Sequence, residues 1–275
     1  MSIKQCCATG SLHTGTPTGT TKQVHGLETY VAEAPNGNPK GIIVIIPDAF
    51  GIALPNNKIL ADEYAKRTNS TVYLPDFMNG ICLPPEVLIS FKAMSAPGLW
   101  NNLYKIGHFF YLMRYVPWFL WGTRRAVCGP RVFDFFKAVR VHEGANLPIG
   151  TAGFCWGGQW VTQLCWDQTR TDDGKRLVDA GFVAHPSMLT YPGDLELIVL
   201  PYSVAASEHD AQMSPAQAEM TKTILAAKTA KTKDQGVEHE FVMEEAERGK
   251  RAEDQAVAWF ERWFQSRPPL AGARA

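Results

Sequence analysis

The feature that most constrains the fold is the uninterrupted apolar run at 41–47, GIIVIIP, in which β-branched residues predominate. A run with no polar side is typical of a strand that is buried on both faces of a sheet. Other short apolar runs alternate with amphipathic stretches, as in a parallel sheet flanked by helices. We therefore predict an α/β fold with strands at 41–47, 71–75, 148–154, 181–184, 200–205 and 237–243, and helices at 57–68, 131–141, 156–166, 215–228 and 251–265.

A short motif, GFCWGG at 153–158, follows the predicted strand at 148–154. It has the G-x-nucleophile-x-G spacing of a nucleophile elbow, with Cys155 in place of serine. Small residues on both sides allow the strand and the following helix to pass closely, and the helix start directs backbone N–H groups at the turn. These effects lower the pKa of a thiol and stabilise an oxyanion. The motif predicts that Cys155 is a nucleophile; the alternative is a buried cysteine at a helix start.

An elbow nucleophile needs an acid and a base, which follow it in that order along the chain. Asp210 lies just past the predicted strand at 200–205, in a polar loop. This position predicts that Asp210 is the orienting acid, with an N-cap of the helix at 215–228 as the alternative.

These motifs resemble the dienelactone hydrolase family, a branch of the α/β-hydrolases that has a cysteine nucleophile. The resemblance extends over residues 24–265 and includes the elbow, the turn IPDAFG at 46–51, the segment FVAHPS at 182–187, and Asp210. The segment 6–19 is similar to that of the fungal-type members, which serve secondary metabolism or aromatic degradation.

The resemblance implies an α/β-hydrolase fold, with a mostly parallel, doubly wound sheet flanked by helices. It also implies hydrolysis of a lactone, ester or thioester through an acyl-cysteine, with no metal and no organic cofactor. In this family an acidic residue of the first turn contacts the resting thiol, and Asp48 occupies that place. The backbone N–H groups of Ala49 and Trp156 are the expected oxyanion hole.

The catalytic base is open between two interpretations. His239 is the one histidine downstream of Asp210, and His239-Glu240-Phe241 resembles the family's His-Gly-Phe triplet. However, residues 237–243 alternate like a strand, and the loop then expected to carry the base, at 244–249, contains no histidine. The first interpretation predicts a Cys155–His239–Asp210 triad. The second predicts an impaired hydrolase-fold protein that binds a hydrophobic small molecule.

An aromatic-rich stretch at 106–122, IGHFFYLMRYVPWFLWG, has Arg114 near its centre. A bilayer span needs about 20 mostly apolar residues, and a central arginine is costly there. A helical cap over the site, or an interfacial helix, is therefore favoured. As a cap, it would form an apolar acyl pocket lined by Phe50, Phe110, Trp118 and Trp121.

The composition and the two ends of the chain indicate the kind of partner, the cellular location and the domain boundaries that we expect. With 27 Lys+Arg against 27 Asp+Glu, the chain lacks the basic surplus of a nucleic-acid binder, so a small, uncharged lactone or ester is the expected partner. The start of the chain lacks an apolar leader, so we expect a cytoplasmic protein without a transmembrane span. Cys6, Cys7 and His13 are better explained as a polar arm than as metal ligands. We expect an arm at 1–22, one domain at 23–267 with a cap insertion at about 83–128, and a tail at 268–275.

Overall fold

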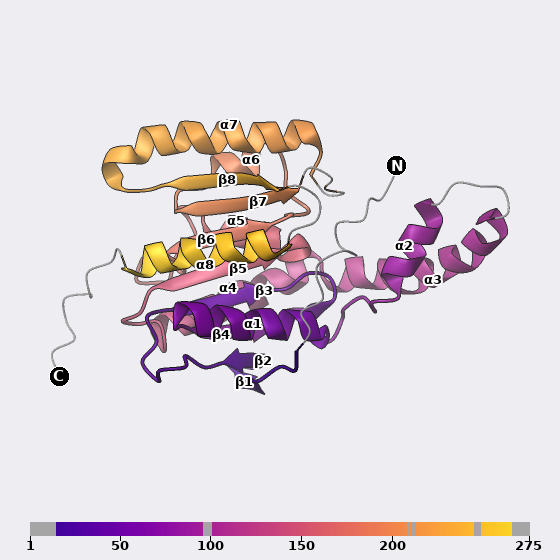
Figure 1. Ribbon diagram of the computed structural model, residues 1–275, viewed down its shortest axis with the longest axis horizontal. Coiled ribbons are helices and arrows are strands. Elements are labelled where there is room, and N and C mark those ends of the chain that lie inside the picture. Colours follow the sequence, from indigo (N-terminus) through magenta and orange to yellow (C-terminus); the bar gives the residue numbers. More distant parts are fainter. Residues whose placement is uncertain (1–14, 96–100, 208–209, 211–212, 245–248, 266–275) are drawn as a thin grey trace.

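The computed structural model describes residues 15–95, 101–207, 210, 213–244 and 249–265. They form one eight-stranded sheet with the strand order β1-β2-β4-β3-β5-β6-β7-β8 (Figure 1). The strands from β4 to β8 are parallel, and the edge strands β1 and β2 are antiparallel. The strand bounds are β1 Thr20–Val24, β2 Leu27–Ala32, β3 Ile42–Ile46, β4 Thr71–Pro75, β5 Ile149–Phe154, β6 Ala180–Ala184, β7 Tyr202–Ser207 and β8 His239–Glu244.

Helices cover both faces of this sheet. One core joins the sheet to α1 and α8, and a second core joins the opposite face to α4, α5 and α7 (Figure 1). The mostly parallel, doubly wound α/β fold is therefore confirmed. The helix bounds are α1 Pro55–Thr68, α2 Val87–Ser95, α3 Asn101–Gly122, α4 Arg125–Val141, α5 Gly158–Leu164, α6 Gly193–Glu196, α7 Pro215–Thr232 and α8 Gly249–Gln265, with single 3₁₀ turns at Gly51–Ala53, Cys155–Gly157 and Lys233–Gln235.

All six predicted strands are present, and β3 is buried along its whole length. The edge strands β1 and β2 were not predicted, because the polar sequence TTKQV of β1 shows no apolar run or alternation. Its first residues, 20–22, fall in the segment expected to be an arm. The remainder of that expected arm is described only for residues 15–19, and the expected tail at 268–275 lies outside the described residues.

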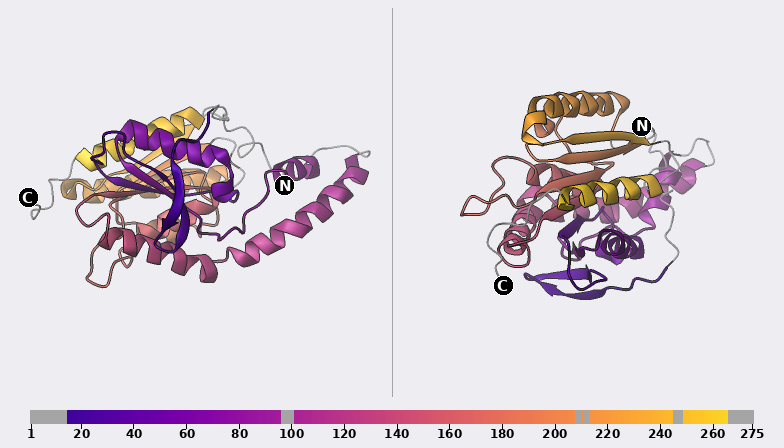
Figure 2. Two further views of the ribbon diagram at one scale, coloured as in Figure 1. Left: turned by 90° about the horizontal axis from the view of Figure 1, so that it is seen from below. Right: turned by 60° about the vertical axis from the view of Figure 1, so that its left-hand side comes forward.

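The helical insertion is present, but its shape differs from the prediction. We call the helices α2 and α3, residues 87–122, the helical arm. The two helices pack chiefly against each other and project from the body (Figures 1 and 2). Near the carboxyl end of α3, Phe119 is buried in the main core. In the described part of the chain, none of the helices combines the length and the apolar character that a bilayer span requires.

Candidate active site

The turn after β5 has the backbone geometry of an elbow. Cys155 has a φ of +47°, a left-handed conformation that is costly for a residue with a side chain. A Cβ on Gly157 would lie 2.0 Å from the carbonyl oxygen of Ile46, and one on Gly158 would lie 2.5 Å from the Cβ of Pro186. The glycines therefore allow the elbow to pack directly against the ends of β3 and β6.

The carboxyl ends of four adjacent parallel strands carry the polar groups nearest to this elbow. Asp48 follows β3, Cys155 follows β5, His185 follows β6, and Asp210 follows β7. Parallel strands end at the same edge of a sheet, so residues that are far apart in sequence meet there. The structure therefore places Asp48, Cys155 and Asp210 at one edge, together with a histidine that was not predicted as a site residue.

Asp48 is held in place by two donors. Its Oδ1 accepts hydrogen bonds from the backbone N–H of Phe50, at 3.0 Å, and from Nδ2 of Asn57, at 3.3 Å. Burial raises the pKa of Asp48 to about 6, and the nearby charge of a Cys155 thiolate acts in the same direction. The carboxyl group can therefore gain or lose a proton close to neutral pH, next to the thiol.

The Cys155 residue also contacts the loop after β6. Its Sγ lies 3.8 Å from the Oγ of Ser187, and its carbonyl oxygen accepts a hydrogen bond of 3.0 Å from the Ser187 N–H. Ala49 and Trp156 are the expected oxyanion-hole residues. Ala49 follows β3 and Trp156 follows β5, and the ends of these two strands are close together because Gly157 packs against Ile46. Their role stays a prediction.

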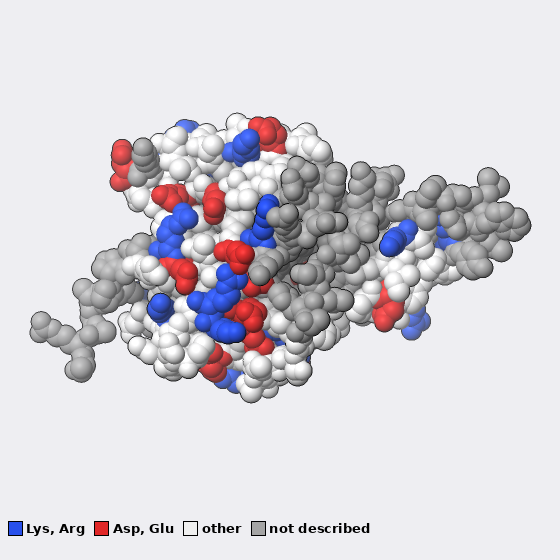
Figure 3. All heavy atoms as spheres, viewed as in Figure 1, with Lys and Arg blue, Asp and Glu red and all other residues white. Residues whose placement is uncertain are grey.

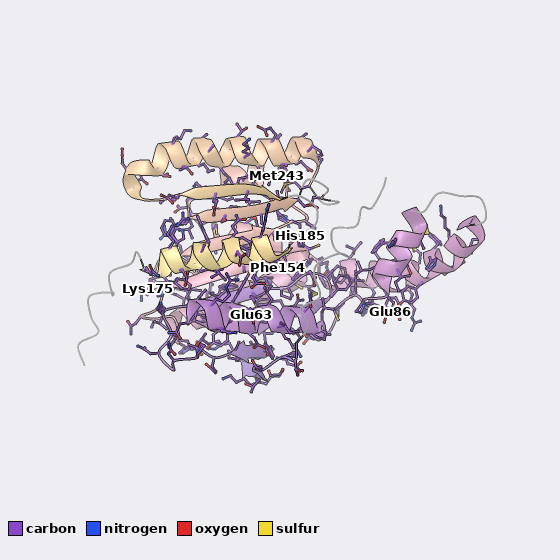
Figure 4. The ribbon with its side chains drawn as sticks, in the orientation of Figure 1. Glu63, Glu86, Phe154, Lys175, His185 and Met243 are labelled. Carbon is purple, nitrogen blue, oxygen red and sulfur yellow. The ribbon has the colours of Figure 1, made fainter. Side chains whose placement is uncertain are left out.

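His185 occupies the strand end beside the elbow. Phe154 pairs with Ala184 across β5 and β6, so the residues that follow them, Cys155 and His185, are neighbours at the sheet edge. His185 has a φ of +40°, and its backbone N–H donates to the carbonyl oxygen of Ala205 at 3.1 Å. Its ring centroid lies 6.4 Å from that of Phe154, and Figure 4 shows both side chains at this end of the sheet.

The pKa of Asp48 also depends on the charge of this histidine. A charge on His185 lowers the pKa of Asp48, whereas a charge on Cys155 raises it, so both groups lie within electrostatic reach of the carboxyl. The sequence signal that could have identified His185 was its place in FVAHPS, directly after a strand.

The structure does not bring His239 to Cys155, which corrects the prediction of a Cys155–His239–Asp210 triad. His239 begins β8, and the register pairs it through Tyr202 and Gly181 with Thr151. It therefore lies near the amino end of the sheet, three strands away from β5. It is level with Thr151, which precedes Cys155 by four residues along β5. At about 3.3 Å per residue and 4.8 Å per strand, His239 and Cys155 are roughly 20 Å apart. The strand interpretation of this segment is the one that the structure supports.

Asp210 lies at the carboxyl edge, as predicted, and its carboxylate is close to the Tyr191 side chain. Burial raises the pKa of Tyr191 to about 12, and the charge of Asp210 adds to this rise. Its neighbour His209 lies outside the described residues.

The predicted pocket residues are separated. Phe50 is buried beside Asp48, but Phe110, Trp118 and Trp121 are 67%, 59% and 60% exposed on the helical arm. The arm projects outward, so these three residues do not line a pocket at Cys155, which corrects that prediction. Sequence periodicity could not show this, because an apolar side chain has the same pattern under a cap as on an exposed arm.

The described residues contain no group of three or more side chains suited to hold a metal ion. Cys6, Cys7 and His13, the residues considered as ligands, lie outside the described residues.

Comparison with known proteins finds sequence similarity to fungal hydrolases. No family model matches the chain. The hydrolase pyvD of Aspergillus violaceofuscus is 29% identical over 81% of this chain and 77% of its own length. Dienlactone hydrolase 1 of Gibberella moniliformis is 26% identical over 67% of this chain, and dienlactone hydrolase 2 of that fungus is 28% identical over 58%. The matches span 61% and 60% of those two proteins, less than two thirds of their length.

Solved structures agree on the fold. A dienelactone hydrolase from Anabaena variabilis has a TM-score of 0.53 at 12% identity, covering 90% of this chain and 96% of its own. The protein TT1662 from Thermus thermophilus has a TM-score of 0.58 at 15% identity, covering 91% and 99%. The fold is thus that of the α/β-hydrolases, and the chain is similar in sequence to fungal hydrolases, two of which are named dienlactone hydrolases.

Proposed function

We propose that this relative of the dienelactone hydrolases cleaves a lactone, ester or thioester of a small hydrophobic molecule through a Cys155 acyl-enzyme. The observation that carries the proposal is the elbow. Cys155 stands on a left-handed turn, between a buried parallel strand and a helix start, with Asp48 and His185 on the neighbouring strand ends. A thiol in this position is accessible to a carbonyl group and close to two groups that take up protons.

In the first half of the reaction, Cys155 Sγ attacks the carbonyl carbon, and the carbonyl π electrons move onto the oxygen. Backbone N–H groups of Ala49 and Trp156 stabilise that oxyanion. The thiol proton passes to His185, and the negative charge of Asp48 stabilises the imidazolium that forms. When the tetrahedral intermediate collapses, the bond to the leaving oxygen or sulfur breaks and His185 returns the proton to it.

In the second half, water attacks the acyl-cysteine and His185 accepts the water's proton. Collapse of this intermediate breaks the bond between carbon and sulfur, releases the carboxylic acid and restores the thiol. We assign the base to His185 because it lies between Cys155 and Asp210 in strand order. Asp210 then approaches His185 from the β7 side.

The test is hydrolysis of p-nitrophenyl acetate by the wild type and by Cys155→Ala, with Cys82→Ala as the control. Cys82 is another partly exposed free cysteine, so it tests for acylation of any accessible thiol. We expect many turnovers by the wild type and by Cys82→Ala, and none above background by Cys155→Ala. Mass spectrometry of the quenched reaction should place the acetyl group on Cys155.

If the wild type binds hydrophobic esters without turning them over, the proposed enzyme is wrong. The chain would then be the impaired, ligand-binding member of the fold that the missing loop histidine suggested.

A further inference from the structure

The helical arm exposes a continuous apolar stripe along α3. At about 100° per residue, the stripe residues fall within roughly 120° of one another around the helix axis, along about 22 Å of its length. Each is roughly half exposed or more, and they are Ile106, Phe109, Phe110, Met113, Leu120 and Trp121. Monomeric proteins rarely expose so much contiguous apolar surface without a binding role.

A second, separate apolar face of α3 already has its partners. Leu112 and Tyr115 pack against the main core, Phe119 is buried in it, and His108 Nδ1 lies 3.1 Å from the Oγ of Ser90. The apolar stripe is therefore not needed to attach α3 to the body. Because both faces are apolar, the helix does not show the single-sided pattern of an ordinary surface helix.

The charge around the stripe is mostly of one sign, with Glu86 just before α2 as the acidic residue nearest to it. Between Glu86 and Asp134 the sequence has six Lys or Arg and no Asp or Glu, whereas the rest of the chain has 21 Lys+Arg and 27 Asp+Glu. In Figure 3 the described surface of the arm is mostly uncharged, with blue side chains and with red where Figure 4 labels Glu86, whereas the body has blue and red side chains side by side. The Arg124 guanidinium lies over the Trp121 ring, 4.4 Å from its centroid.

The base of the arm adjoins the candidate active site. Leu83, which leads into α2, donates its N–H to the carbonyl oxygen of Ala49 at 2.8 Å. A Cβ on Gly51 would lie 3.3 Å from that of Cys82. The arm extends from the edge of the sheet at which the strands carrying Cys155 and His185 end (Figures 1 and 4).

We propose that the apolar stripe of α3 docks onto an anionic lipid surface. Aromatic and aliphatic side chains bordered by basic residues are the pattern of a helix that lies in the membrane interface. The indole of Trp121 can enter the acyl boundary while Arg124 meets the headgroups. A symmetric pair of arms would instead bring two surfaces with a net basic charge together, which charge repulsion opposes. Docked in this way, the arm places the carboxyl edge of the sheet near the lipid.

The test is co-sedimentation of the full chain with phosphatidylcholine vesicles that either contain or lack phosphatidylserine. We expect binding to the anionic vesicles, weakened by salt, and much less binding to the neutral ones. The double variant Phe110→Ser/Trp121→Ser should lose at least about tenfold in partition coefficient, since it removes two large apolar anchors. The double variant Lys92→Glu/Arg114→Glu should lose about tenfold or more on anionic vesicles and little on neutral ones.

Matched controls come from the body. Met220→Ser changes an exposed apolar residue of α7, and Lys222→Glu changes an exposed cation of that helix; both should bind as the wild type does. Thermal unfolding checks that each variant is folded, and Ile106→Ser/Met113→Ser provides a second stripe variant.

Three results would overturn the proposal. The wild type could fail to bind either vesicle, the body controls could lose as much binding as the stripe variants, or light scattering could show a dimer that the stripe variants dissociate. The last result would mean that a second copy of the chain covers the stripe. Co-sedimentation measures binding to the vesicles and not ester cleavage, so its outcome is independent of the proposed function.

Discussion

At the carboxyl end of the central strands, Asp48 and His185 stand on the strand ends next to that of Cys155, whereas at the amino end buried charged groups make structural contacts. Arg140 there forms a buried ion pair of 2.8 Å with Asp179, whose Oδ2 also accepts from the N–H of Ile149 at 2.8 Å. His239 lies near the same end as the first residue of β8. The comparison shows that strand direction, and not residue type alone, decides which titratable groups can take part in chemistry.

The largest effect that we expect is on stability, and it concerns the buried ion pair at the amino end. Asp179→Ala leaves the buried Arg140 without its counter-charge, so the free energy of unfolding should fall by about 3–5 kcal/mol. Asp167→Ala removes an exposed carboxylate that pairs with Arg170 and Arg176, and should destabilise the fold much less than Asp179→Ala does, because solvent screens these pairs. Urea unfolding measures both. Equal losses would mean that the amino-end pair has no special structural role.

The next prediction compares the enzymatic activities of variants at the two histidines. His185→Gln should lower kcat/KM for p-nitrophenyl acetate by about 10²–10⁴-fold, because it removes the proposed general base. His239→Gln should change kcat/KM by no more than about threefold, since its ring cannot reach the thiol. In His185→Gln, the thiolate formed at higher pH should recover part of the acylation rate. A severe loss in His239→Gln with normal activity in His185→Gln would reverse the assignment.

A smaller effect is expected in how the stability of the wild type, compared with that of Asp48→Asn, changes with pH. The pKa of Asp48 is about 6 in the folded chain and near 3.8 in the unfolded chain, so the folded state binds more protons between those values. The stabilisation that Asp48 contributes at low pH is therefore lost as the pH rises from about 4 through about 6. Relative to Asp48→Asn, the wild type should lose about 1–2 kcal/mol over that window, in thermal unfolding at a series of pH values.

A control for this pH effect is Glu219→Gln, which changes an exposed carboxylate of α7. Its difference from the wild type should stay constant over the same range. A constant difference for Asp48→Asn as well would contradict the raised pKa of Asp48.

The smallest effect has the opposite sign and belongs to the amino end. Burial, with the charge of Lys228, lowers the pKa of His239 to about 4, and its Nδ1 is buried without a hydrogen-bond partner among the described residues. The unfolded chain therefore binds more protons between about 4 and 6.5, so this stabilisation is lost as the pH falls. The wild type should lose about 1 kcal/mol between pH 7 and pH 5 that His239→Leu does not lose. Calorimetry at the two pH values detects the difference, and parallel losses would argue for a solvated ring.

The two histidines also show how far prediction from the sequence reached. The strand at 237–243 and the missing histidine at 244–249 were both visible, and they already argued against His239. What the sequence did not show was that His185, only 30 residues from Cys155 in the chain, stands on the adjacent strand end. That proximity depends on the placement of β6 between β5 and β7, which is a property of sheet order.

The aromatic stretch illustrates the same limit. Its helical character and its lack of a bilayer span were predicted, but its orientation was not. A helix with two apolar faces is compatible with a cap over a pocket and with an exposed arm, because periodicity records which residues share a face and not what covers that face.

The sequence by itself determined the buried strands, the glycine-flanked elbow at Cys155 and the position of Asp210 after β7, because these features depend on local conformation and on burial within a few residues. Only the tertiary structure decided that His185 adjoins the nucleophile, that His239 is about 20 Å from it, and that α3 extends into solvent. Those outcomes are set by the order of the strands and the direction in which each leaves the sheet. Both result from packing between segments that are distant in the chain.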